Sequence, residues 1–269
     1  MEKCLSGEAI LIRAPMITGI DDIVRREVET LAAGENRRDK LIVVLETTGG
    51  SVEVVERISD VFRQHFKTVV FVVPNFAYSA GTVLCLSGDE IYMDYYSVLG
   101  PIDPQIRTSD GRWVPGLGYL KKYDELAKRH PISQPKREFL LNNFDPATLF
   151  SLEQAKKQLE DLIVQWLVNY KFKNWTRTET TGKKPDKEAR AQEIAKLLGD
   201  AEEWKSHGRG IPMKTLVSDK VKLRIKDFGA DQSLNVAVRG YYDLFIDYCA
   251  MLGSEVVVHT RHRFLNLGR

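Results

Sequence analysis

Residues 68–105 read TVVFVVPNFAYSAGTVLCLSGDEIYMDYYSVLGPIDPQ, and this stretch predicts a strand, a small-residue turn, a short helix and a second strand. Its first part, Thr68–Val73, is a continuous run of mostly β-branched residues, which predicts a strand buried on both faces. Small residues follow, and Gly81–Leu86 predicts a short helix. A strand that passes through a small-residue turn directly into a helix can present one side chain at an exposed corner. Here that side chain is the hydroxyl of Ser79.

A second strand-to-turn junction lies about 30 residues upstream. The apolar run Leu41–Leu45 predicts another buried strand, and it is followed by Glu-Thr-Thr-Gly-Gly-Ser-Val. Turns that contain Gly49 and Gly50 can leave backbone N–H groups free to bind an anion. The two junctions together suggest a serine nucleophile beside an oxyanion hole.

Apolar strands alternate with amphipathic helices through the first part of the chain, which predicts the α/β class with a parallel sheet covered on both faces. We expect one domain with three regions: a βα core that carries the nucleophile (1–115), a helical region (116–200), and a C-terminal region of returning strands (201–269). The expected strands of the core are 9–12, 41–45, 69–73 and 90–93, with helices from 21 and over 52–66. In the last region, 215–217, 221–225 and 255–259 are expected to be strands around a helix over 238–252.

Composition excludes several kinds of partner. The 269 residues include 39 basic and 37 acidic ones, a net charge of +2, so no field of one sign favours nucleic acid or an anionic membrane. The three cysteines have no CxxC spacing and no histidine pair has metal-ligand spacing, so we expect no disulfide framework, no metal and no cofactor. No apolar run approaches 18 residues, and a cytoplasmic location is expected.

Several short motifs together resemble the Clp protease/crotonase superfamily. They are 47–52, 78–81, 89–94 and 98–105, and the run Ser-Val-Leu-Gly-Pro-Ile-Asp-Pro-Gln with the later Trp204–Ile211 is most similar to the serine dehydrogenase proteinase family, relatives of signal peptide peptidase A. The resemblance covers roughly residues 8–106 and returns near 201–223. It implies a spiral of βα units with a helical C-terminal arm, peptide or protein substrates, and trimers, hexamers or larger homo-oligomers.

The resemblance also implies roles for individual residues. Ser79 matches the family nucleophile, and the backbone N–H groups of Gly50 and Ala80 match its oxyanion donors. A histidine about 25 residues beyond the serine, as in the Clp proteolytic subunit, is absent here. Signal peptide peptidase A and its short relatives use a lysine some 40 to 50 residues downstream instead, and Lys121 and Lys122 lie 42 and 43 residues after Ser79.

Helical periodicity distinguishes the two lysines. Lys122 borders the apolar side of a predicted helix, whereas Lys121 points away from it, so Lys122 is the first choice as general base and Lys121 the second. A lysine base must be neutral, which requires burial. The alternative is an exposed lysine pair that forms ion pairs with Asp124 and Glu125.

Two other polar residues have structural interpretations that we prefer to catalytic ones. His207 is a possible alternative base, but the favoured interpretation is a turn residue that hydrogen-bonds the backbone ahead of a strand at Ile211. Asp103 lies in a turn with two prolines, and we interpret it as an Asx-turn residue in preference to a catalytic acid.

Three functions follow from these observations. The first is a serine peptidase with a Ser-Lys dyad. The second is a crotonase-like acyl-CoA enzyme, although the sequence has no carboxylate pair after the second strand. The third is an inactive relative that serves as a scaffold or binding module.

Overall fold

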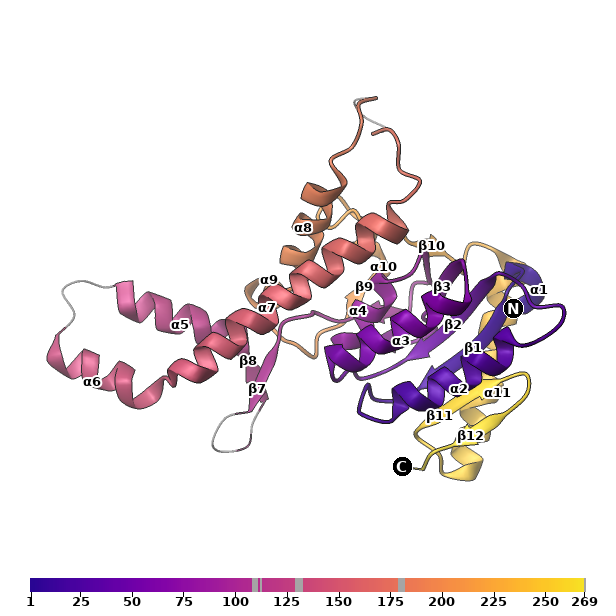
Figure 1. Ribbon diagram of the computed structural model, residues 1–269, viewed down its shortest axis with the longest axis horizontal. Coiled ribbons are helices and arrows are strands. Elements are labelled where there is room, and N and C mark those ends of the chain that lie inside the picture. The colour runs from indigo at the N-terminus through magenta and orange to yellow at the C-terminus, as the bar shows by residue number, and fades with distance from the viewer. Residues whose placement is uncertain (108–110, 112, 129–132, 179–181, 269) are drawn as a thin grey trace.

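The computed structural model describes residues 1–107, 111, 113–128, 133–178 and 182–268 (Figure 1). Within these ranges no helix is long and apolar enough to cross a membrane.

A seven-stranded sheet forms the body of the protein, in the order β10-β5-β3-β2-β1-β11-β12. Strands β10, β5, β3, β2 and β1 pair in parallel, and β11 and β12 are antiparallel additions beside β1. The predicted α/β class with a parallel-rich sheet is therefore confirmed. The strands are β1 (Glu8–Arg13), β2 (Lys40–Glu46), β3 (Thr68–Val72), β5 (Glu90–Met93), β10 (Lys226–Asp227), β11 (Val257–Thr260) and β12 (Phe264–Asn266).

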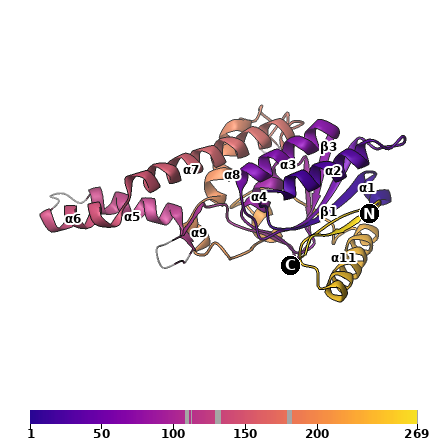
Figure 2. The same ribbon diagram turned by 60° about the horizontal axis from the view of Figure 1, so that its bottom comes forward.

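Helices cover both faces of this sheet, because its central strands are apolar on both sides. Figure 2 shows α11 on the opposite side of the sheet from α2 and α3. The helices of the body are α1 (Glu2–Leu5), α2 (Ile20–Ala32), α3 (Val52–His65), α4 (Ala80–Leu86), α10 (Met213–Val217) and α11 (Gln232–Leu252). Two of them begin at side-chain caps: Ser51 Oγ accepts from the Val54 N–H, and Asp231 from the Leu234 N–H.

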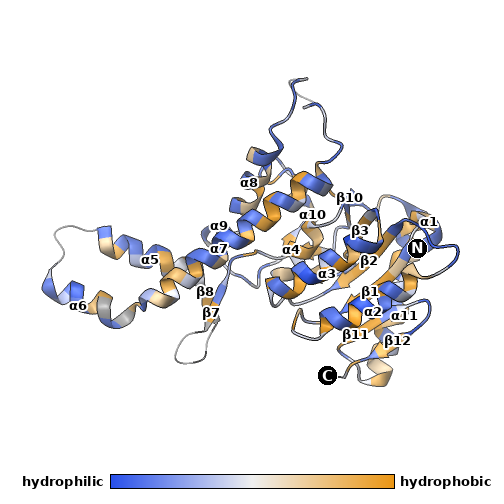
Figure 3. Ribbon diagram, viewed as in Figure 1, coloured by the Kyte–Doolittle hydropathy of each residue, from blue (hydrophilic) through white to orange (hydrophobic). Residues whose placement is uncertain are grey.

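A helical arm extends from the body, with α7 as its long axis (Figure 1). The helical arm that the family resemblance implies is therefore present. In Figure 3, the inner end of α7 is striped with hydrophobic residues where it meets the body, and α5 and α6 are largely hydrophilic. The elements of this part are β7 (Gln105–Arg107), β8 (Trp113–Pro115), α5 (Gly116–Lys128), α6 (Gln134–Asn143), α7 (Pro146–Trp166), the π-helix η1 (Leu167–Lys171), α8 (Lys187–Leu198) and α9 (Ala201–Trp204).

The C-terminal region differs in part from the sequence prediction. Residues 215–217 belong to α10 and 221–225 form no strand, whereas β11 confirms the expected strand near 255–259. The segment 213–225 instead buries Leu216, Val221 and Leu223 singly against the main core. Apolar residues at alternate positions therefore indicated burial here and not sheet pairing.

A small second sheet, which the sequence did not predict, lies beside the large one. It consists of β4 (Phe76–Ala77), β6 (Val98–Leu99) and β9 (Ile211–Pro212). Strands β4 and β6 are parallel, and β9 is antiparallel to β6, so Ala77, Leu99 and Ile211 form one row. This row sets the geometry of the candidate site.

Candidate active site

Ser79 lies at the predicted corner, between β4 and the first residue of α4. Its backbone has a φ of 51°, in the region that favours glycine, and its side chain makes no capping hydrogen bond to the helix that it precedes. The turn is closed by the Gly81 N–H, which donates to the Tyr78 carbonyl at 2.8 Å. The hydroxyl is therefore held in a strained turn and is not used for helix capping.

The Gly49-Gly50 turn packs directly against this corner. A Cβ on Gly49 would lie 2.8 Å from Ser79 Cβ, and a Cβ on Gly50 would lie 2.3 Å from the Met16 carbonyl oxygen. Both glycines also have positive φ, at 96° and 147°. Only glycine meets these two demands at once.

The backbone N–H groups of Gly50 and Ala80 form no hydrogen bond within the described part of the chain. Neighbouring groups are occupied: Gly49 O accepts from Met16 N, and Ser51 N donates to Met16 O, each at 2.8 Å. Two free amide donors beside a serine hydroxyl form the arrangement that binds an oxyanion.

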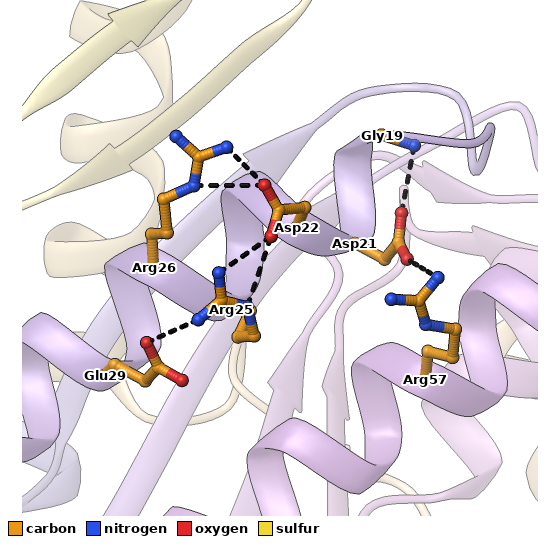
Figure 4. Close-up of polar contacts among 7 residues, drawn as sticks. All are labelled: Gly19, Asp21, Asp22, Arg25, Arg26, Glu29 and Arg57. Atoms are coloured by element: carbon orange, nitrogen blue, oxygen red, sulfur yellow. Dashed lines mark hydrogen bonds and ion pairs between the residues drawn. The ribbon is translucent and has the colours of Figure 1, made fainter.

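A buried carboxylate holds the loop that carries Met16. Asp21 accepts from the Gly19 N–H at 3.0 Å and forms an ion pair with Arg57 of α3 at 2.7 Å, although it is 4% exposed (Figure 4). This pair ties the start of α2 to the helix that begins at the Gly-Gly turn. Figure 4 also shows a neighbouring surface cluster in which Asp22 binds the guanidinium groups of Arg25 and Arg26.

The small sheet brings two more polar residues to the same edge. Ser79 follows β4 by two residues, Asp103 follows β6 by four, and His207 precedes β9 by four. Because β9 runs antiparallel, its beginning lies at the edge where β4 and β6 end. Residues separated by more than 100 positions in the chain therefore meet at one place.

His207 and Asp103 form a hydrogen-bonded pair. His207 Nδ1 lies 2.9 Å from Asp103 Oδ1, and Gln105 Nε2 donates to the other carboxylate oxygen at 2.7 Å. The Asp103 side chain is 1% exposed and that of His207 24%. Both residues thus differ from the interpretations preferred from the sequence: the His207 ring binds a carboxylate, and both Asp103 oxygens bind side chains.

One cavity contains all of these groups. It has a volume of about 490 Å³, and its polar wall includes Ser79, Gly50, Ala80, Asp103 and His207. Apolar side chains complete it, among them Val52, Val83, Ile102 and Leu159. A pocket with an apolar wall and a few convergent polar groups is typical of a substrate site.

The structure places the two candidate lysines outside this cavity. The side chain of Lys121 is 50% exposed and forms an ion pair with Glu202, and that of Lys122 is 62% exposed and lies 3.3 Å from Glu125. The hydrogen bond that Lys121 donates to Glu202 raises the pKa of Lys121, which favours the charged form that cannot accept a proton. Lys122 thus pairs with Glu125, one of the two partners that the sequence alternative names, whereas Lys121 pairs with Glu202 of α9.

A buried polar network lies behind the site and was missed from the sequence. Glu46, at the end of β2, forms an ion pair with Arg13 at 3.0 Å and accepts hydrogen bonds from Tyr242 and Asn75. Burial raises the pKa of Tyr242, so its phenol remains protonated and can donate. The sequence feature that could have indicated this network is Glu46, an acidic residue directly after the apolar run Leu41–Leu45. Among the described residues, no group of three histidine, cysteine or acidic side chains is arranged to hold a metal ion.

Residues 20–128 match the model of a family described as ClpP-like SDH-type serine proteinases. The resemblance predicted from the sequence motifs is thereby confirmed over this segment, which contains Ser79 and the Gly-Gly turn. This part of the chain is thus similar to ClpP-like serine proteinases.

Two curated proteins of Methanocaldococcus jannaschii, both themselves uncharacterized, are also similar. One is 36% identical over 64 residues, which is 24% of this chain and 22% of the relative, and the other is 39% identical over 70 residues, 26% of this chain and 24% of the relative. The matched segment thus spans about a quarter of the length of each relative.

Three solved structures overlap more of the chain at lower identity. Two are of the 1510-N membrane-bound stomatin-specific protease, one of them in complex with a substrate peptide. They are 15% and 16% identical with TM-scores of 0.48 and 0.49, and cover 81% of this chain and 76% and 72% of theirs. The third, ClpP1 from Listeria monocytogenes, is 11% identical with a TM-score of 0.43, covering 80% of this chain and 89% of its own.

Proposed function

We propose that this protein is a serine peptidase that hydrolyses peptide bonds with Ser79 as nucleophile, His207 as general base and Asp103 as the group that orients the histidine. One observation carries the proposal: the hydrogen-bonded His207–Asp103 pair lines the same cavity as Ser79 and the free amides of Gly50 and Ala80. Nucleophile, base, orienting acid and oxyanion donors are the parts that acyl transfer requires.

The hydrogen bond to Asp103 selects the useful tautomer of His207. When Nδ1–H donates to the carboxylate, Nε2 is the unprotonated nitrogen that can accept the serine proton. Gln105 binds the second carboxylate oxygen and so limits rotation of Asp103. The imidazolium that forms during the reaction is stabilised by the adjacent buried carboxylate.

The proposed reaction begins when Ser79 Oγ attacks the peptide carbonyl carbon and its proton moves to His207 Nε2. The negative charge that develops on the carbonyl oxygen is stabilised by the N–H groups of Gly50 and Ala80. As the tetrahedral intermediate collapses, the C–N bond breaks and His207 protonates the leaving amine. Water, deprotonated by His207, then hydrolyses the acyl-enzyme.

A histidine base is favoured here over the lysine dyad that the family resemblance implies. Neither Lys121 nor Lys122 lines the cavity of Ser79, and both have acidic partners. A lysine base would require one of these side chains to leave its partner, enter the cavity and lose its proton. The lysine assignment therefore stays a prediction, and variants can separate the two.

The test is labelling of Ser79 with a fluorophosphonate probe, followed by intact-mass analysis. We expect the wild-type chain to form one adduct, Ser79→Ala to form none, and His207→Gln to react at least about 10³-fold more slowly. Lys122→Met and Lys121→Met serve as matched controls that retain wild-type reactivity. Fast labelling of His207→Gln with slow labelling of Lys122→Met would assign the base to the lysine, and no adduct on the folded wild type would favour a scaffold.

We also propose that the protein acts as a homo-oligomer of the trimer or hexamer type on peptide or protein substrates. Helix α11 leaves Val236, Leu244 and Met251 exposed on its outer surface, at 67%, 73% and 83%. Large apolar side chains gathered on one helix are typical of an association surface. Light scattering that gives a monomer mass at micromolar concentration would contradict this part of the proposal.

A further inference from the structure

The Ser79 cavity contains an acidic side chain that the proposed reaction does not use. Glu53, the second residue of α3, lines this cavity together with Asp103 and His207, and no lysine or arginine is among the described residues of its wall. Asp103 is not available to a ligand, because its two oxygens bind His207 and Gln105. Glu53 is exposed, so its carboxylate supplies a negative charge that a ligand in the cavity can reach.

The N-terminal cap of α3 holds the Glu53 side chain in place. Ser51 Oγ accepts from the Val54 N–H at 3.2 Å and donates to Glu53 Oε2 at 2.6 Å. A carboxylate has about four acceptor positions, so this contact leaves room for a cationic donor. The hydrogen bonds from Ser51 and from its own backbone N–H lower the pKa of Glu53, and the carboxylate therefore keeps its charge at neutral pH.

Glu53 forms no ion pair with any residue in the described part of the chain. On a helix surface, the nearest position for a cationic partner is one turn away, and α3 has Arg57 there. Arg57 is bound instead to Asp21 of α2 at 2.7 Å, a contact that Figure 4 shows. The negative charge at the cavity wall is thus not neutralised by the protein itself.

Apolar side chains beside Glu53 suit the stem of a long basic side chain. Val52, Val83 and Leu159 line the same cavity. Lysine and arginine bury their methylene stems against apolar surface and keep the charged end at a polar group or in water. An acidic side chain in the same place would be repelled by Glu53. The wall of the cavity therefore favours a basic side chain over an acidic one.

The position of Glu53 in the chain limits where such a side chain lies in the substrate. Gly50, whose N–H is a proposed oxyanion donor, precedes Glu53 by three residues, so their Cα atoms are at most about 11 Å apart. An extended substrate advances about 3.3–3.6 Å per residue. The cation is therefore expected within about three residues of the scissile bond.

We propose that the Ser79 cavity binds a lysine or arginine side chain of the substrate and that Glu53 is its counter-ion. The inference rests on the proposed peptidase function and adds a substrate class: polypeptides with a basic residue near the cleaved bond. Glu53 does not contact the reacting atoms, so it determines specificity and not chemistry. Because its carboxylate is exposed, we expect a preference of moderate size that salt weakens.

The first experiment measures peptide binding by fluorescence anisotropy in a Ser79→Ala background. The probes are octapeptides of alanine, serine and leucine with lysine or norleucine at one central position, and fluorescein blocks the N-terminal amine. We expect the ratio of the norleucine Kd to the lysine Kd to fall at least about fivefold in Glu53→Gln, which removes the charge and keeps the shape. Equal ratios with Glu53 and with Glu53→Gln would overturn the proposal.

Asp60→Asn is the matched control for this measurement. Asp60 is exposed on the same face of α3, two turns further along, and does not line the Ser79 cavity. The variant removes the same charge from the same helix, so we expect its ratio of Kd values to stay within about twofold of that of the parent protein. A fall as large as that of Glu53→Gln would assign the preference to the general field of the protein and contradict a local counter-ion.

Charge reversal at the same position gives a result that loss of folding cannot imitate. Glu53→Lys should bind a peptide with central glutamate more tightly than the lysine peptide, which reverses the order found with Glu53. Both preferences should shrink when the salt concentration is raised to about 1 M, where the screening length is about 3 Å. The same order of affinities in the two proteins would contradict the role of Glu53.

An N-terminal amine carries the same charge as a basic side chain, and a further probe separates the two. A norleucine octapeptide with fluorescein at its C-terminus is compared with a free and with an acetylated N-terminus. Equal Kd values support recognition of a side chain. Tighter binding of the free amine that Glu53→Gln abolishes would assign Glu53 to the recognition of chain ends and overturn the proposal.

Fluorophosphonate labelling of the wild-type protein is measured beside these experiments. A lysine preference that depends on Glu53, without any labelling of Ser79, would leave a cation-binding cavity and contradict the peptidase function. Labelling of Ser79 together with equal ratios for Glu53 and Glu53→Gln would contradict the specificity and leave the peptidase function intact. The two failures are therefore distinguishable.

Discussion

Ser79 retains a backbone conformation that a serine rarely adopts, and its neighbours explain why. A positive φ costs a non-glycine residue on the order of 1 kcal/mol and persists where the surroundings leave no alternative. Here Gly49 and Gly100 both pack against the turn: a Cβ on Gly49 would lie 2.8 Å from Ser79 Cβ, and one on Gly100 would lie 3.0 Å from Ser79 N. Close packing by these two glycines thus holds the backbone of Ser79 in this conformation.

Gly50→Ala tests the requirement for glycine beside this corner. Its φ of 147° is unfavourable for alanine, and the added Cβ would meet Met16 O at 2.3 Å. We expect the free energy of unfolding in urea to fall by about 2–4 kcal/mol. Gly240→Ala is the matched control: it lies within α11 with no atom within 4 Å of its Cβ, so we expect a gain of about 0.5–1 kcal/mol. Equal effects of the two variants would contradict this interpretation.

Asp103→Asn tests the orienting role of the buried carboxylate. The amide is nearly isosteric but can donate to His207 Nδ1, which would leave the proton on Nε2, where it cannot accept one from Ser79. We expect kcat to fall by about 10⁴-fold with a smaller change in KM, measured on a chromogenic peptide. The kcat of Gln105→Leu, which keeps the hydrogen bond between His207 and Asp103, should fall much less. A raised KM with an unchanged kcat for Asp103→Asn would contradict the orienting role.

At the scale of single elements, the end of α7 is unusual because it continues as the π-helix η1. Its last residue, Lys171, lies near Cys85, Asp89 and Glu90. Burial lowers the pKa of Lys171 to about 8, and burial also raises the pKa of the Cys85 thiol. At this end of the arm helix, the surroundings of Lys171 therefore favour the neutral amine over the charged ammonium group.

Lys171→Met is expected to stabilise the protein at neutral pH. The unfolded lysine titrates near 10.5 and the folded one near 8, so between these values the unfolded state binds more protons and stability rises with pH. The burial penalty is fully present below pH 8, and its removal should raise the free energy of unfolding at pH 7 by on the order of 2 kcal/mol. Urea unfolding at pH 7 and pH 10 checks this: the gain should shrink as the pH rises. A loss of stability at pH 7 would contradict it.

The small β4-β6-β9 sheet explains why elements of two residues matter for the site. Strands this short have no periodicity, so hydrophobic patterning cannot predict them. Their pairing nevertheless aligns Ala77, Leu99 and Ile211 and so places the residues beyond them together. His207, which the sequence favoured as a turn residue, reaches the Ser79 cavity through this pairing.

At the scale of the whole molecule, α11 holds the segment that leads to Ser79 from the far side of the sheet. Arg239 of α11 forms an ion pair with Asp94 and donates to the Pro74 carbonyl at 2.7 Å, while Tyr242 lies 3.2 Å from Asn75. Pro74 and Asn75 directly precede β4. The C-terminal helix is thereby part of the support of the candidate site.

Arg239→Met should be strongly destabilising because it leaves the Asp94 carboxylate, which is 3% exposed, without its charged partner. We expect a loss of about 3–5 kcal/mol in the free energy of unfolding. In the double variant with Asp94→Asn the buried charge is gone, so the combined loss should be at least about 1 kcal/mol smaller than the sum of the single losses. Additive losses in urea unfolding would contradict a direct ion pair.

The sequence by itself determined the α/β core, the corner that carries Ser79, and the Gly-Gly turn beside it. These features are local: β-branched runs, helical periodicity and small residues act within a few positions of where they occur. The family match over residues 20–128 covers the same part of the chain.

The tertiary structure alone brought His207 to Asp103 and separated Lys121 and Lys122 from the Ser79 cavity. The spacing of a lysine from a serine along the chain does not determine their distance in space, because β5, β6 and the β7–β8 pair lie between Ser79 and α5, which carries both lysines. Which polar side chains share the cavity of Ser79 depends on long-range strand pairing. No local pattern encodes that pairing.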